Sequence, residues 1–142
     1  MSKSVLEIID KIWTEMNKIK SDTSRGLTPL AELLTEFSAI VWEQRRIVSW
    51  YKTSYEISFI QKKQERENDL KDLLAKWDKS VKITDAELKR YAEQELIDDY
   101  RAWKDNESVR EEIDVIYDAY VRQYYSIKWD RSEGMQESKF YN

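Results

Sequence analysis

The chain of 142 residues contains neither cysteine nor histidine. Disulfides, thiolate nucleophiles, histidine metal ligands and histidine general bases are therefore all excluded. Any chemistry would have to use carboxylates, lysines, tyrosines or hydroxyls. We expect no cofactor, no metal site and no enzymatic activity.

Glycine and proline are also scarce, with two residues and one residue respectively. So few turn formers, together with 37% charged and 41% hydrophobic residues, favour long helices with exposed sides. No apolar run approaches the ~20 residues that a membrane span requires. The N-terminal apolar stretch contains acidic residues, which a signal peptide would not. We therefore expect a cytoplasmic protein that does not contact a membrane.

Apolar residues recur every three or four positions along most of the chain, and this period predicts an all-α fold in a single domain. The predicted elements are a short helix at 4–20, a long helix at 29–77, a second long helix at 84–131 and a flexible tail at 132–142. Because the connection between the long helices is short, we expect them to run antiparallel as an elongated helical hairpin. A helix over 29–77 would be roughly 70 Å long.

Three sequence signals mark the starts of these helices. Ser4 with Glu7, and Thr84 with Glu87, have the spacing of a capping box. Thr28 is followed by Pro29, which predicts Thr28 as an N-cap and Pro29 as the first helical residue. The three predicted helices therefore all have a defined beginning.

The long helix at 29–77 is apolar on two faces. One stripe predicts its core face and consists of Phe37, Val41, Val48, Tyr51, Tyr55 and Phe59. The matching stripe of the second long helix consists of Val109, Ile113, Ile116, Tyr117, Tyr120, Tyr124 and Ile127. A second apolar face requires a second partner, either the N-terminal helix or another copy of the protein. We predict self-assembly and an oligomer or partner interface formed by Trp42, Ile57, Ile60, Tyr125 and Trp129.

Charge is distributed unevenly along the chain. The net charge is −4, yet residues 43–66 carry six basic and three acidic side chains. Basic helix surfaces bind phosphates, and an exposed tryptophan can stack on an unpaired base. The residues that this interpretation assigns to DNA binding are Arg45, Arg46, Trp50, Lys52, Lys62, Lys63 and Arg66. The other interpretation is an ordinary solvated helix face.

The order of these elements resembles that of UvsY-type recombination mediators of tailed phages. The matching segments are "YEISFIQKKQER", "KITDAELKRYAEQE" and "YVRQYYSIKWDRSEG", and the resemblance covers about residues 30–134. It implies a homo-oligomer that binds single-stranded DNA and helps a recombinase to displace a single-strand-binding protein in the cytoplasm of an infected host cell. The six basic residues above would then form the DNA-contacting segment.

Two alternatives remain open. The first is a helical protein–protein interaction module, such as a phage adaptor, virion component or inhibitor, that binds no nucleic acid. The second is Mg²⁺-dependent nucleotide hydrolysis, suggested by Glu111 and Asp114, which stand three residues apart on one predicted helix face. Only half of the paired carboxylate pattern of such enzymes is present. These acids are better explained as a solvated face that pairs with Arg110 or Arg122.

Overall fold

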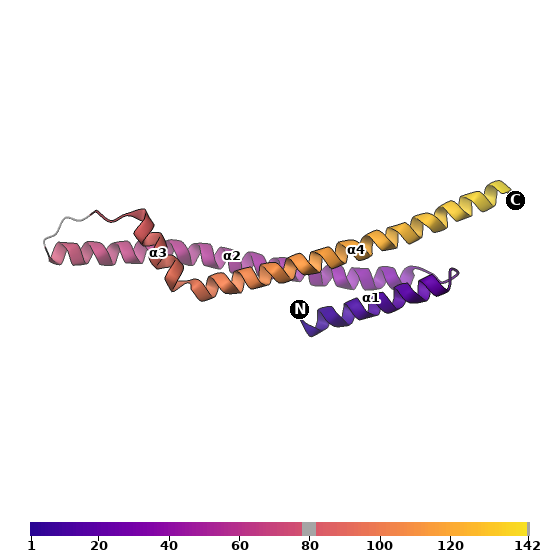
Figure 1. Cartoon of the computed structure of the whole chain (residues 1–142), viewed down its shortest axis with the longest axis horizontal. Helices are drawn as coiled ribbons and strands as arrows, with labels where there is room; N and C mark the ends of the chain where they lie inside the picture. Colours follow the sequence, from indigo (N-terminus) through magenta and orange to yellow (C-terminus); the bar gives the residue numbers. More distant parts are fainter. Residues whose placement is uncertain (78–81, 142) are drawn as a thin grey trace. The chain divides into compact units, whose positions relative to one another are not determined.

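The computed structural model describes residues 1–77 and 82–141, with the side chains of 1–77 and 82–132. This part of the chain forms helices and no strand, which confirms the all-α prediction. The helices are α1 (Lys3–Ser21), α2 (Thr28–Lys76), α3 (Asp85–Glu95) and α4 (Ile97–Tyr141) (Figure 1). Residues 78–81, within the predicted connection, and residue 142, at the end of the predicted tail, lie outside the described residues.

The single helix expected at 84–131 is instead two helices, α3 and α4. The backbone leaves helical geometry at Leu96, where φ is −109° and ψ is 22°. The Leu96 side chain is buried, as are those of Leu88 and Ala92 on α3. Neither glycine nor proline stands at the break, where a buried leucine replaces the usual turn-forming residue. The helical backbone of α4 then continues to Tyr141, through most of the segment predicted as a tail.

The start of α3 agrees with the sequence prediction, and the starts of α1 and α2 differ from it. Thr84 is the N-cap of α3, and its hydroxyl accepts a hydrogen bond from the Glu87 amide at 3.3 Å. In α1 the N-cap is Ser2 rather than Ser4, because the Ser2 hydroxyl already accepts from the Val5 amide at 3.4 Å. Thr28 is the first residue of α2 rather than its cap.

The chain forms two compact units where the sequence predicted one domain. The first unit comprises Met1–Arg45 with Val109–Asn142, and the second comprises Arg46–Ser108. Helices of 49 and 45 residues are too long for one compact core to enclose, so each contributes residues to both units.

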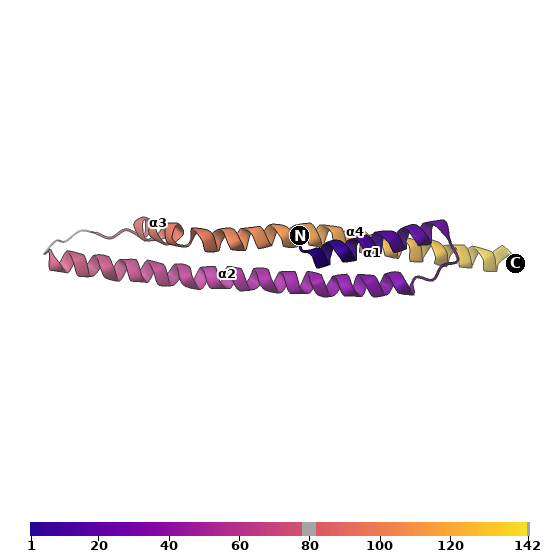
Figure 2. The ribbon, with the colours of Figure 1, turned by 90° about the horizontal axis from the view of Figure 1, so that it is seen from below.

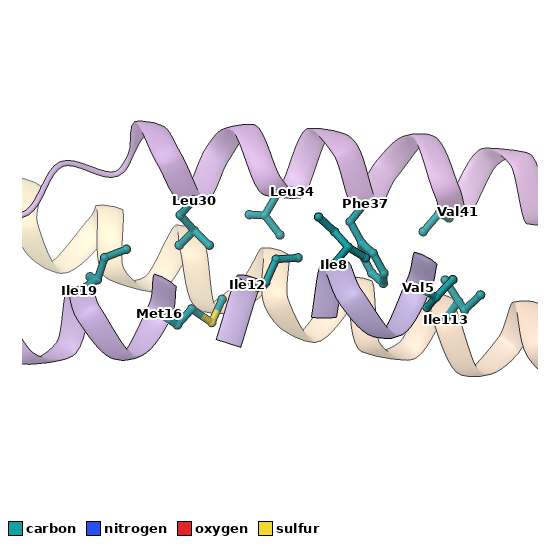
Figure 3. Packing of buried hydrophobic residues seen from close by; sticks show 10 residues of the cluster. All are labelled: Val5, Ile8, Ile12, Met16, Ile19, Leu30, Leu34, Phe37, Val41 and Ile113. Carbon is teal, nitrogen blue, oxygen red and sulfur yellow. The ribbon is translucent and has the colours of Figure 1, made fainter. Parts of the chain in front are cut away.

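In the first unit α1 runs antiparallel to the beginning of α2, and both pack against α4 (Figures 1 and 2). Figure 3 shows the core between them, formed by Val5, Ile8, Ile12, Met16, Ile19, Leu30, Leu34, Phe37, Val41 and Ile113. The predicted stripe of α4 is confirmed, because Ile113 is buried and its other six members are partly buried against this core. The N-terminal helix therefore shares one core with both long helices.

The second unit has a smaller core with more aromatic residues. Val48, Leu88, Ala92 and Leu96 are buried. The ring of Tyr55 lies 5.6 Å from that of Tyr100 and 5.5 Å from that of Trp103, measured between centroids. Tyr51, Tyr55 and Phe59, predicted as core, are partly buried.

Candidate functional site

The first of the predicted DNA-binding cations, Arg45, belongs to the first unit and is engaged within the chain. Its guanidinium lies 3.2 Å from the Asp114 carboxylate and 5.5 Å from the centroid of the Trp42 ring. Asp114 also lies 3.6 Å from Arg110. The charge of Arg45 is therefore balanced by an acid on α4.

Three further cations of α2 make contacts inside the second unit. Lys63 lies 2.7 Å from Asp85, at the start of α3, and Arg66 lies over the ring of Tyr91 at 5.0 Å. Lys62 pairs with Glu65 at 3.4 Å along α2. The hydrogen bond from Lys63 holds the pKa of Asp85 below its usual value, against the opposing effect of burial. These contacts direct Lys63 and Arg66 towards α3.

Trp50 lies on a different face of α2. At 100° per residue, Trp50 and Arg46 are within about 40° of each other, whereas Lys62 and Arg66 are roughly 120–160° away from Trp50. The Trp50 side chain is 63% exposed, and its ring meets that of Tyr51 edge-to-face at 5.0 Å. A hollow of about 380 Å³ beside it is lined by Arg46, Ile47, Trp50 and Tyr51. The seven predicted DNA-binding residues thus do not share one surface.

An uncharged strip runs along the exposed face of α2 in the second unit. We call it the outer strip, and its members are Trp50, Thr53, Ile57, Ile60 and Gln64. All five side chains are exposed, including the large apolar ones, of which Ile60 is 64% and Ile57 is 52% exposed. At 100° per residue they lie within about 40° either side of one line along the helix. Within this angular range, the residues from 50 to 64 include no charged side chain.

The predicted interface residues are all exposed, but they belong to different units. Ile57 and Ile60 are part of the outer strip. Trp42, Tyr125 and Trp129 belong to the first unit and are at least 60% exposed. Sequence analysis missed Thr53 and Gln64, because a search for apolar residues passes over polar ones. The alternating spacing of three and four residues from Trp50 to Gln64 is the signal that could have found them.

A second hollow in this unit lies beside an aromatic cluster. It measures about 370 Å³ and is lined by Tyr55, Glu93, Ile97 and Tyr100. The ammonium group of Lys104 lies 4.2 Å from the centroid of the Trp103 ring on the same cluster. Burial raises the pKa of the Tyr55 hydroxyl, and the nearby Glu93 carboxylate raises it further.

The carboxylates considered as Mg²⁺ ligands are paired with arginines. Asp114 lies within 4 Å of both Arg45 and Arg110, and Glu111 lies 3.8 Å from Arg110. Among the described residues, no three histidine, cysteine, aspartate or glutamate side chains are grouped so that they could hold a metal ion. In the same part of the chain, none of the helices has a stretch long and apolar enough to pass through a bilayer.

Comparisons with family models, with curated proteins and with solved structures found no match to this chain. The functional interpretation therefore depends on the chain's own surfaces.

Proposed function

We propose that this protein is a non-enzymatic helical interaction module that binds a protein partner through the outer strip of α2. The observation that supports this proposal is the strip itself: Trp50, Ile57 and Ile60 are more than half exposed on one uncharged helix face. Contiguous exposed apolar surface on a soluble protein is typical of interaction sites. Aromatic residues are enriched in such interfaces, where they carry much of the binding energy.

A photo-crosslinking side chain placed at Ile57 tests this proposal in cells that produce the protein. We expect defined crosslinked protein species that disappear when Ile60 is also changed to lysine. The matched control carries the same group at Val115, a 70% exposed residue of α4. Crosslinking that is equal at both positions, or absent at Ile57, would contradict the proposal.

Single-stranded DNA binding is the second candidate function. Trp50 presents an exposed ring beside Arg46, whereas Lys52, although exposed, lies about 160° around the helix from Trp50. An exposed ring can stack on a base while the cations meet phosphates. If the resemblance to UvsY-type mediators holds, a recombinase or a single-strand-binding protein would be the protein partner in the host cytoplasm.

A salt-dependent titration of a labelled dT oligonucleotide separates the two candidates. DNA binding predicts a steep loss of fluorescence anisotropy between low and physiological salt, because neutralised phosphates release counterions. The change Arg46→Glu should then strongly weaken binding, whereas Lys11→Glu, at an exposed lysine of the first unit, makes the same charge change as a control. No binding at low salt would exclude this candidate.

A further inference from the structure

We propose that the partner seated on the outer strip is the outer strip of a second copy of this chain, so that two α2 helices pair along it. The inference rests on the proposed function and adds the identity of the partner. Trp50, Thr53, Ile57, Ile60 and Gln64 follow one another at intervals of three, four, three and four residues. These are the intervals between the a and d positions of a heptad repeat, and they keep the outer strip facing a partner helix over four turns.

The absence of charge on the strip favours an identical copy as its occupant. Two identical surfaces present the same charges to each other, so a charged strip would repel its own copy. Between Trp50 and Gln64 the strip carries none, and Arg46, one turn before Trp50, is the first charge on the same line of the helix. The residues along one edge, Ser54 and Gln61, are also uncharged. The other edge carries Glu56, and Lys63 beyond it pairs with Asp85 of α3.

The shape of the surface also fits a facing helix. The hollow of about 380 Å³ beside Trp50, the first residue of the strip, provides space for a side chain from another helix. Ile57 and Ile60 occupy the middle of the strip, where two copies would bury them against each other. Thr53 and Gln64 have side chains that can hydrogen-bond to polar side chains of the partner. Because the outer strip spans only two heptads, we expect a reversible dimer of roughly micromolar affinity.

The test measures the mass of the purified full-length protein by sedimentation and light scattering between about 1 and 100 µM, a range that brackets micromolar affinity. The test variant is Ile57→Lys with Ile60→Lys. The matched control is Leu6→Lys with Val115→Lys, which changes two aliphatic residues of the first unit that are also more than half exposed. Circular dichroism establishes that each variant remains helical.

We expect the wild type and the control to form dimers or larger assemblies as the concentration rises. The test variant should stay monomeric, with a dissociation constant at least about a hundredfold higher, because two central interface residues become charged. Mixing two differently tagged preparations of the pure protein should give co-purification with the wild type and none with the test variant.

Two results would overturn this inference. A wild-type protein that remains monomeric at 100 µM would exclude a second copy, while crosslinking from Ile57 to another protein would still support the proposed function. Assembly that is equally strong in the test variant would show that copies associate elsewhere. Absence of any crosslink from Ile57 in cells would instead contradict the proposed function itself.

Discussion

The Glu15 carboxylate and the Arg25 guanidinium form a two-bonded ion pair in the first unit. Arg25 Nε lies 2.7 Å from Glu15 Oε1, and Nη2 lies 3.0 Å from Oε2. Glu15 is only 6% exposed. The carbonyl oxygen of Arg25 accepts a hydrogen bond from Arg131 Nη1 at 2.6 Å. This pair and this hydrogen bond tie α1, the loop before α2, and α4 together.

Replacing Glu15 by glutamine should therefore destabilise the first unit. We expect a loss of about 1–3 kcal/mol in the free energy of unfolding, because the Arg25 guanidinium loses its charged acceptor at a largely buried position. Urea denaturation followed by circular dichroism measures this change. The control is Glu7→Gln, which removes an exposed pair with Lys3 and should cost less than about 0.5 kcal/mol. Equal effects of the two changes would argue against a structural role for the buried pair.

The same pair predicts a dependence of stability on acid pH. The hydrogen bonds from Arg25 hold the pKa of Glu15 below its usual value, although burial acts in the opposite direction. Because the folded pKa is the lower one, the stabilisation is fully present above the unfolded value of about 4.3 and is lost as the pH falls through the folded value. Thermal melts between pH 6 and pH 3 should show the wild type losing more stability than Glu15→Gln. Parallel pH profiles would exclude this linkage.

Phe37 and Trp42 stand five residues apart on α2 and should respond very differently to truncation. Phe37 is fully buried in the core of the first unit, and its ring packs against Tyr117 with 5.5 Å between centroids. Phe37→Ala should reduce stability by about 3–5 kcal/mol through lost burial and a residual cavity. Trp42 is 66% exposed, and Trp42→Ala should change stability by no more than about 0.5 kcal/mol. Chemical denaturation of both variants in parallel tests the assignment of the two faces.

The faces of α2 could be predicted because helical periodicity depends only on local spacing. Phe37, Val41 and Val48 are buried, and Trp50 and Ile60 on the other half of the helix are exposed, as the sequence predicted. The start of α3 at Thr84 followed from the same kind of local signal. Each of these features involves residues within one or two turns of each other.

The features that could not be predicted depend on residues far apart in the sequence. The break at Leu96 has no glycine or proline to mark it, and the Leu96 side chain is buried in the core of the second unit. The pairs of Arg45 with Asp114 and of Lys63 with Asp85 join different helices. The sequence does not show that acids on other helices pair with these cations, so it predicted a single DNA-binding surface from the cations of residues 45–66. The structure places these cations in two units and on opposite faces of α2.

The hydroxyl of Tyr55 provides a test of the second unit at alkaline pH. Burial raises the pKa of this group, and the Glu93 carboxylate adds to the effect. A folded pKa above the unfolded value of about 10 means that its contribution to stability is present below that value and is lost as the pH rises through the folded one. The wild type should therefore lose more stability than Tyr55→Phe between pH 9 and pH 11.

Glu93→Gln provides the complementary measurement for the same site. Removing this negative charge should lower the Tyr55 pKa, and Glu95→Gln, at an exposed residue outside the hollow, should leave it unchanged. Carbon-13 labelling of the tyrosine rings resolves the titration of Tyr55 from that of the other eight tyrosines. Suppose that Glu93→Gln lowers the Tyr55 pKa and Tyr55→Phe removes the alkaline loss of stability. The hollow then excludes enough solvent for the charge of Glu93 on α3 to raise the pKa of Tyr55 on α2. If neither change has an effect, the Tyr55 hydroxyl is solvated in solution.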